Sequence, residues 1–307
     1  MRTEDFVVIV LTSALELNRL VSFIKPLVDS QETRKPRTDA FQVMAPHLVG
    51  KTVLITGSTD SRSLGWTAAK LLAGGDYGFS HIILSGIKED AGRKAAQELQ
   101  RSLPQDSPVM ISAINLDITD KVSVESAAAL ISSPVGPLSA YGGRLDVLAV
   151  WSCPLKKLQA EDMMYVMKTN VAAVVELTNA LLPSLAKSEA PRVVNVSSAR
   201  GSLSFEAGLP PERTGGMVYN ASKAALNMVT VMQSKNLPAF APKLKVNAAT
   251  PGHTKTPFNN FTGTRALEEG AAVIVHLATL PEDGPAGQLI GDQAPYSTNG
   301  HFAQIPW

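Results

Sequence analysis

Short apolar runs alternate with amphipathic segments along the chain from residue 49 onward. Each run is apolar throughout rather than at every second position, which is typical of strands buried on both faces of a parallel sheet. We therefore predict six buried strands, at residues 53–55, 82–84, 109–116, 145–150, 193–196 and 244–248.

The segments between these runs carry apolar residues at helical spacing. They predict helices at residues 64–73, 91–103, 122–131, 162–185 and 219–237. Strands that alternate with helices through right-handed crossovers build an α/β fold, here a Rossmann-type doubly wound parallel sheet. Ligands of such sheets bind beyond the carboxyl ends of the strands, so the residues there are the candidates for function.

The first 47 residues do not continue this pattern. We interpret residues 1–47 as an N-terminal extension and residues 48–307 as a single domain. A strongly apolar run at 6–11 is followed by apolar positions at helical spacing, and residues 29–46 have the composition of a polar linker. We favour an amphipathic helix packed on the domain or on a second subunit, with an anchor at a membrane surface as the alternative.

Charged residues in the extension argue against two other interpretations. Glu16, Arg19 and Lys25 interrupt the apolar pattern before it reaches the about 20 residues of a transmembrane helix. Glu4 and Asp5 precede the apolar run, whereas a signal peptide begins with basic residues. We therefore expect no membrane-spanning segment and a cytoplasmic protein.

The composition excludes several classes of protein. The chain has 28 Lys and Arg residues against 27 Asp and Glu residues, and this near-neutral balance gives no field to hold a nucleic acid. Its single cysteine, Cys153, cannot form an internal disulfide and leaves no thiolate zinc cluster, so we expect no metal site. We interpret Cys153 as a buried small residue rather than a nucleophile.

The turn after the first predicted strand has features of a phosphate site. The strand ends at Gly57, and the small and polar residues up to Gly65 lead into a helix. Backbone N–H groups and the helix dipole at such a place favour a pyrophosphate. The usual glycine spacing is missing, so an ordinary polar loop is an equal alternative. Arg62 in this turn is a candidate partner for the 2′-phosphate of NADP.

The tip of the second predicted strand favours NADP over NAD. An acidic residue there would bind the ribose 2′-hydroxyl of NAD, but Gly86 occupies that position and Lys88 follows two residues later. The alternative is that Lys88 and Arg62 are ordinary solvated cations.

Tyr219 and Lys223 are four residues apart at the start of a predicted helix and so share one face of it. A free tyrosine has a pKa of about 10, and a nearby ammonium group stabilises the phenolate. Tyr219 is therefore a candidate proton donor to a carbonyl oxygen that accepts hydride at its carbon.

Two further residues support this interpretation. Ser198 ends the fifth predicted strand, where its hydroxyl can polarise a carbonyl. Asn170 lies in the preceding long helix, and a buried amide there requires a partner, for which a water linked to Lys223 is a candidate. Each of these residues could instead have a purely structural role, such as a strand-end cap, a polar residue inside a helix or a surface lysine. The four together favour a catalytic site.

These residues resemble the short-chain dehydrogenase/reductase family. The resemblance covers residues 48–307 and rests on Thr56-Gly57, Leu116-Asp117, Asn170, Ser198, Tyr219 with Lys223, and the Asn-Ala-Ala-Thr-Pro-Gly run at 247–252. The segments 219–227 and 277–285 and the terminal Ile-Pro-Trp are most similar to carbonyl-reductase-like members.

The resemblance implies that Tyr219 is the acid/base, Lys223 a ribose contact that lowers the tyrosine pKa, Ser198 the carbonyl polariser, and Asn170 the holder of a relay water. It places Asp117 at the adenine and the Pro251-Gly252 turn beside the nicotinamide. The full set of expected NADP contacts is Gly57, Thr59, Arg62, Ser63, Leu64, Gly86, Lys88, Asp117, Ile118, Trp151, Tyr219, Lys223, Pro251, Gly252 and Thr254.

The sequence departs from the family pattern in three places. Ser63, Leu64 and Gly65 replace the first-turn glycines with a spacing similar to the enoyl-reductase branch, although the closer spacing of Tyr219 and Lys223 favours C=O reduction. Val-Trp-Ser-Cys at 150–153 stands where the family has Asn-Asn-Ala-Gly, which puts Trp151 beside the cofactor. The usual cofactor-side arginine past the second strand is Ile87.

Two loops are expected to enclose the substrate. The loop at 199–218 contains Phe205 and Leu209, and the segment 253–265 contains Phe258 and Phe261 and is expected to form a lid. Their apolar side chains favour a hydrophobic substrate. His253 in the lid is interpreted as a surface or substrate-contact residue rather than a second acid/base.

The leading hypothesis is an NADPH-dependent reductase that converts a ketone or aldehyde of a hydrophobic small molecule to an alcohol, or the reverse. One alternative is an enzyme of the same fold that reduces C=C or C=N or catalyses a non-redox rearrangement or cyclisation. Another is a non-catalytic cofactor-binding protein. We expect no nucleic-acid or metal partner, and a homo-oligomer remains open because related proteins occur both as oligomers and as monomers.

Overall fold

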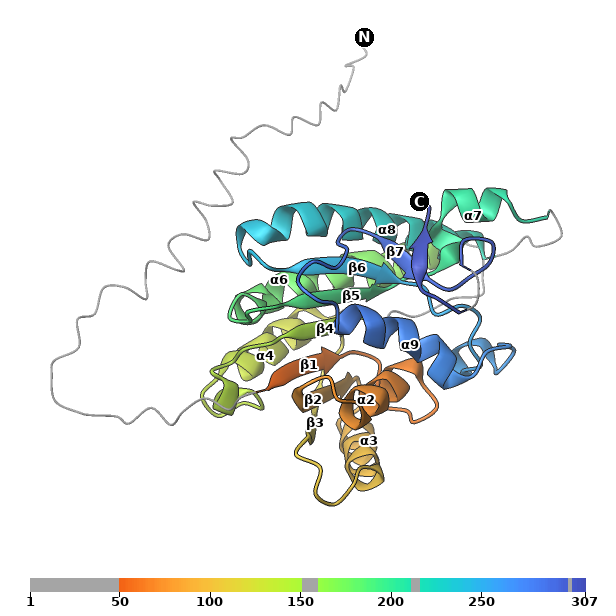
Figure 1. Ribbon diagram of the computed structural model, residues 1–307. Helices are drawn as coiled ribbons and strands as arrows, with labels where there is room; N and C mark the ends of the chain where they lie inside the picture. Colours follow the sequence, from red (N-terminus) through yellow and green to blue (C-terminus); the bar gives the residue numbers. More distant parts are fainter. Residues whose placement is uncertain (1–49, 151–159, 211–215, 298–299) are drawn as a thin grey trace, which may run out of the picture. The chain divides into compact units, whose positions relative to one another are not determined.

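A single sheet of eight strands forms the centre of the described domain (Figure 1). The computed structural model describes residues 50–150, 160–210, 216–297 and 300–307. The strand order is β3-β2-β1-β4-β5-β6-β7-β8, and neighbouring strands are parallel except for the antiparallel pair β7 and β8. The strands are β1 (Lys51–Ile55), β2 (Phe79–Gly86), β3 (Met110–Asn115), β4 (Val147–Val150), β5 (Arg192–Val196), β6 (Lys245–Ala249), β7 (Leu289–Gly291) and β8 (Ala303–Ile305).

Helices cover both faces of this sheet because side chains of a strand alternate between its two faces. In β1, Val53 and Ile55 join one buried cluster with α2 (Leu64–Gly74), α3 (Glu89–Ser102) and α9 (Leu267–Ala278). Leu54 joins the opposite cluster with α4 (Lys121–Ser132), α6 (Ala173–Leu185) and α8 (Met217–Asn236). The predicted apolar strands in the middle of the sheet are buried in this way on both sides. The strand predicted as buried at 109–116 differs, because β3 lies at the edge of the sheet and is mostly half-buried or exposed, with Met110 48% exposed.

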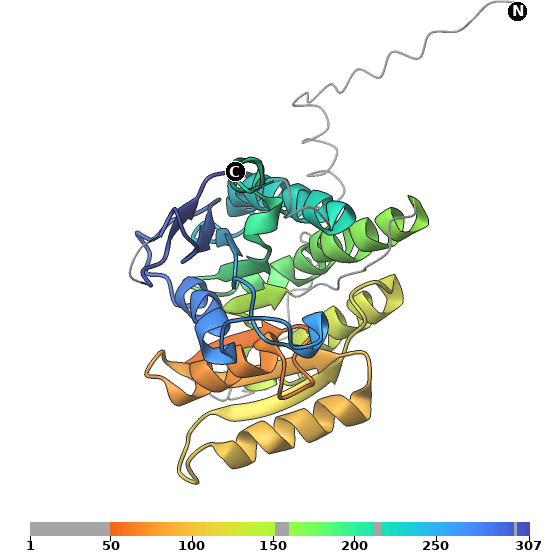
Figure 2. The same ribbon diagram turned by 90° about the vertical axis from the view of Figure 1, so that its right-hand side faces the viewer.

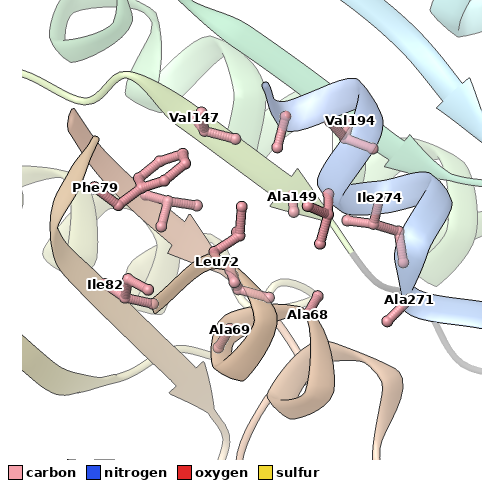
Figure 3. Packing of buried hydrophobic residues seen from close by; sticks show 14 of the residues in the cluster. Ala68, Ala69, Leu72, Phe79, Ile82, Val147, Ala149, Val194, Ala271 and Ile274 are labelled. Carbon is pink, nitrogen blue, oxygen red and sulfur yellow. The ribbon is translucent and has the colours of Figure 1, made fainter. Parts of the chain in front are cut away.

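Figure 3 shows the first of these clusters from close by. Leu72 of α2 lies on the side of Ile82 of β2, and Ile274 of α9 lies on the side of Val194 of β5, within one continuous cluster. Figure 2 shows the side view, with α3 lying along the edge of the sheet formed by β2 and β3. The crossover direction reverses between β1 and β4, so the carboxyl ends of these strands border the crevice in which doubly wound sheets bind ligands.

The predicted fold class is confirmed, with differences in detail. Strands β7 and β8 and helix α9 were not predicted; the two strands have three residues each, too few to show a pattern. The predicted helix at 162–185 is interrupted: α5 (Ala160–Met167) is followed by a π-helical turn, η2 (Lys168–Ala172), and then by α6.

The segment predicted as a loop at 199–218 also contains regular structure. A 3-10 turn, η3 (Ala199–Gly201), and the short helix α7 (Leu203–Ala207) follow β5 directly. The N-terminal extension, Trp151 and Cys153 lie outside the described residues. Within the described ranges, no helix is both long and apolar enough to cross a membrane.

A buried histidine in β2 makes the stability of the fold depend on pH. His81 is only 1% exposed, its Nε2 lies 2.8 Å from the Ser112 hydroxyl of β3, and its ring packs 5.9 Å from that of Tyr141. Burial lowers the pKa of His81 to about 4 because the charged imidazolium loses its solvation.

We predict that the fold loses stability as the pH falls below about 6.5, where an unfolded histidine takes up a proton. The folded-state pKa is depressed, so this contribution is complete above pH 6.5 and is lost progressively toward pH 4. Urea unfolding should give a free energy of unfolding that is lower at pH 5 than at pH 7 by about 2 kcal/mol because of this residue.

The variant His81→Gln keeps a hydrogen-bonding side chain next to Ser112 and does not titrate. Its loss of stability between pH 7 and pH 5 should be smaller than that of the wild type by about the same 2 kcal/mol. An identical pH dependence in the two proteins would contradict the assignment.

Candidate active site

Ser198 and Tyr219 meet where β5 and α8 approach each other. Ser198 lies two residues past β5, and its Oγ accepts a hydrogen bond from Arg200 N at 3.1 Å as the cap of η3. Tyr219 is in the first turn of α8, which begins after Gly216, a residue with a φ of 76° that favours glycine. Burial raises the pKa of Tyr219 to about 12, while a hydrogen bond to Ser198 and the positive charge of Arg200 oppose this shift.

Lys223 follows Tyr219 one helical turn later and is 2% exposed. Its Nζ lies 5.5 Å from the centroid of the Tyr219 ring and donates a hydrogen bond of 2.8 Å to the carbonyl oxygen of Val196 in β5. Burial lowers the pKa of Lys223 to about 7. The predicted pairing of these two residues on one helix face is therefore present.

Asn170 lies behind this pair in the π-helical turn η2, a type of turn that is frequent at functional sites. Its Nδ2 donates to Ser222 Oγ at 2.9 Å, and Ser222 in turn donates to the carbonyl oxygen of Tyr219 at 2.7 Å. The Asn170 Oδ1 atom is buried and has no hydrogen-bond partner among the described residues. A buried acceptor of this kind is a suitable anchor for an ordered water.

A cavity of about 1000 Å³ opens in front of Ser198, Tyr219 and Lys223. Phe205 and Leu209 from the segment after β5 line one part of it, and Phe258 from the segment after β6 lines another. The ring of Phe258 packs edge-on against Tyr219 with centroids 6.4 Å apart. Both predicted loops thus contribute apolar side chains to the same cavity as the catalytic candidates.

The first turn forms another wall of this cavity through Gly57, Ser63 and Leu64. Gly57 has a φ of 60°, and Ser63 caps α2 by accepting a hydrogen bond from Trp66 N. A Cβ at Gly65 would lie 3.0 Å from the Gly57 carbonyl oxygen, so the missing side chain lets the helix start close to the strand. The first N–H groups of a helix have no acceptor within it, which suits an anionic group such as a pyrophosphate.

Three further predicted cofactor contacts come from the segment after β6. Pro251, Gly252 and Thr254 follow β6 and line the cavity. Gly252 has a φ of 72°, and Thr254 Oγ1 donates to the carbonyl oxygen of Pro251 at 3.1 Å.

The residues predicted to hold the adenosine end do not line this cavity. A Cβ at Gly86 would lie 2.7 Å from Thr59 Oγ1, so the absence of a side chain makes room for Thr59. Lys88 is exposed at the start of α3. Asp117 Oδ1 accepts hydrogen bonds of 2.8 Å from both N and Oγ1 of Thr119.

Two other predicted contacts have surroundings that the sequence did not indicate. Ile118 packs against the buried cluster that contains α4. Arg62 forms a double hydrogen bond with Asp60 at 3.0 and 2.8 Å and lies 5.9 Å from the ring centroid of Phe261. Trp151 lies outside the described residues. Among the described residues, no group of His, Cys, Asp or Glu side chains is arranged to bind a metal ion.

Sequence reasoning missed several residues of the site. Ser222, the partner of Asn170, lies directly before Lys223, and its place on the same helix as Tyr219 and Lys223 was the available signal. Arg200 lines the cavity beside Ser198 and forms an ion pair with Glu206, and Gln293 lines it from the segment after β7. Nothing in their local sequence indicated these contacts.

Comparison with known proteins identifies the family. Residues 51–266 match the family model described as short chain dehydrogenase. The chain is 28% identical over 309 residues to (-)-isopiperitenone reductase from Mentha piperita, which covers 78% of this chain and 95% of that protein. It is 27% identical over 286 residues to (+)-neomenthol dehydrogenase from Arabidopsis thaliana, which covers 76% and 93%.

Among solved structures, the NADPH-bound carbonyl reductase from chicken fatty liver shares the fold with a TM-score of 0.67 at 23% identity, covering 85% of this chain and all of that one. The family match over more than half of the chain agrees with the eight-stranded sheet and with the arrangement of Ser198, Tyr219 and Lys223. The chain belongs to the short-chain dehydrogenase/reductase family of oxidoreductases.

Proposed function

We propose that this protein reduces a ketone or aldehyde of a hydrophobic small molecule to an alcohol, or catalyses the reverse oxidation, with NADPH or NADP as its cofactor. The observation that carries the proposal is the common cavity of Ser198, Tyr219 and Lys223, with Asn170 buried behind them. The curated relatives are named as a reductase and a dehydrogenase, which is consistent with this chemistry.

In the proposed reaction a nicotinamide held beside Pro251 and Gly252 would supply hydride to the carbonyl carbon. The Ser198 hydroxyl donates a hydrogen bond to the carbonyl oxygen and polarises it, and Tyr219 gives its proton to the same oxygen. The Lys223 ammonium stabilises the resulting phenolate. Asn170 Oδ1 is suited to hold a water on the path by which Tyr219 regains a proton.

The proposal of a hydrophobic substrate rests on the walls of the cavity. Phe205, Leu209 and Phe258 line the cavity that Tyr219 also lines, and the Phe258 ring packs against that of Tyr219. A volume of about 1000 Å³ is large enough for a nicotinamide ring together with a medium-sized apolar molecule.

The proposal of NADPH rests on charge near the tip of β2. Gly86 carries no acidic group to repel a 2′-phosphate, and Lys88, two residues later, is exposed. The acidic residues that follow, Glu89 and Asp90, lie 3.1 and 3.5 Å from the guanidinium of Arg93, which offsets part of their charge.

The direct test is a titration with NADPH and NADH, followed by a panel of ketones and aldehydes that is monitored by nicotinamide absorbance. We expect NADPH to bind more tightly than NADH and to be oxidised with apolar carbonyl compounds. If neither cofactor binds at millimolar concentration, the proposal is wrong.

We predict that Tyr219→Phe lowers kcat/KM for carbonyl reduction at least about 100-fold, because the general acid is lost. The matched control is Tyr165→Phe, which alters a tyrosine that is 52% exposed on α5. The control should retain wild-type kinetics. Unchanged turnover by Tyr219→Phe would refute the assigned role.

We predict that Lys88→Glu weakens NADPH binding about tenfold and leaves NADH binding nearly unchanged, because a carboxylate would repel the 2′-phosphate. Lys94→Glu on the same helix makes the same change of charge at another exposed position and serves as control. Calorimetry measures the affinity of each variant for NADPH and for NADH. Equal effects of the two substitutions would show that Lys88 has no specific role.

A further inference from the structure

A second cation lies beside the catalytic tyrosine. Arg200 is two residues past Ser198, and its backbone N–H donates to Ser198 Oγ at 3.1 Å. Its side chain lines the cavity that contains Tyr219, and its charge acts on the Tyr219 hydroxyl in the direction that favours the phenolate. Arg200 therefore contacts one catalytic candidate through its backbone and influences another through its guanidinium.

The position of this guanidinium is held by two other elements. Its Nε lies 2.7 Å from Glu206 Oε1 on α7, and the side chains of Arg200 and Glu206 are only 30% and 26% exposed. Glu206 Oε2 accepts a hydrogen bond of 3.1 Å from Asn220 Nδ2, which is on α8 directly after Tyr219. The ion pair is thus tied to the turn of the helix that carries the tyrosine.

The positive charge of Lys223 depends on pH. Burial lowers its pKa to about 7, so a growing fraction of Lys223 is neutral above neutral pH. An arginine side chain stays positively charged throughout the pH range in which enzymes work. Arg200 is therefore the cation that persists beside Tyr219 under alkaline conditions.

Among the described residues, the other charged and titratable groups around the site come from the first turn, the segment after β6 and α7. Asp60 of the first turn lines the cavity and is paired with Arg62, and His253 lines it after β6. Glu206 forms an ion pair with Arg200. Its negative charge therefore acts directly on the field of Arg200 at Tyr219.

We propose that Arg200 is a positioning residue that stabilises the phenolate of Tyr219 electrostatically, and that Glu206 sets the strength of this effect. The proposal rests on the proposed function, since it concerns the proton transfer from Tyr219. In the reduction, the Tyr219 O–H bond breaks as the new O–H bond of the alcohol forms, and the phenolate charge left behind faces Lys223 and Arg200.

The test is the pH profile of kcat/KM for alcohol oxidation by the holoenzyme, which rises with pH as the Tyr219–Lys223 pair loses a proton. Removing the positive charge in Arg200→Gln should move the midpoint of this rise upward by about 0.5 to 1 pH unit. Removing the negative charge in Glu206→Gln should move it downward. Arg200→Lys, which retains the charge, should remain close to the wild type.

The opposite directions separate this proposal from a merely structural role. If the ion pair only braced α7 against α8, Arg200→Gln and Glu206→Gln would both lower the rate at all pH values without moving the midpoint. That outcome, or a shift of both midpoints in the same direction, would overturn the proposal. Should Arg200→Gln fail to fold, the downward shift in Glu206→Gln remains decisive.

A measurement that requires no turnover tests the role of Arg200 separately from the proposed function. The NMR signal of ¹³Cζ-labelled Tyr219, assigned by its loss in Tyr219→Phe, reports ionisation in the cofactor-free protein. The change in its chemical shift on ionisation should begin at higher pH in Arg200→Gln and at lower pH in Glu206→Gln. An enzyme without redox turnover that still shows these shifts would contradict the proposed function alone, and unchanged onsets would contradict the role of Arg200.

Discussion

The close approach of η3 to α8 is the constraint on which the site depends. A Cβ at Gly201 would lie 2.5 Å from the carbonyl carbon of Lys223 and 2.8 Å from the nitrogen of Ala224, so only glycine lets the turn rest directly on the helix backbone. This contact places the end of β5 beside the first turn of α8. Ser198 is thereby brought to Tyr219, and the Val196 carbonyl comes within 2.8 Å of Lys223 Nζ.

Burial dominates the electrostatics of the site. It raises the pKa of Tyr219 to about 12 and lowers that of Lys223 to about 7. Both shifts favour the neutral forms of the pair. A site of this kind needs fixed dipoles and charges to support ionisation, and the hydroxyl of Ser198 and the guanidinium of Arg200 are available for this.

Sequence reasoning succeeded where a contact follows from a local period. Tyr219 and Lys223 share a helix face because they are one turn apart, and the apolar strands were recognisable because both faces of the sheet are covered. It failed where contacts join distant segments, as in the hydrogen bond from Asn170 to Ser222, 52 residues apart. The partner of Arg62 was also missed, because a general charge argument cannot tell that Asp60 in the same turn engages the guanidinium.

The π-helical turn at Lys168–Ala172 makes the placement of Asn170 sensitive to chain length rather than to residue type. A π turn contains one residue more than an α turn and absorbs it locally, so the helices on either side keep the faces of a continuous α-helix. Deleting a single residue here would restore regular α-helical geometry through α5 and α6, but it would remove the widened turn in which Asn170 lies. A lineage could therefore lose the hydrogen bond from Asn170 to Ser222 through one codon deletion while Asn170, Ser198, Tyr219 and Lys223 are all retained, and an alignment would show this change only as a single gap.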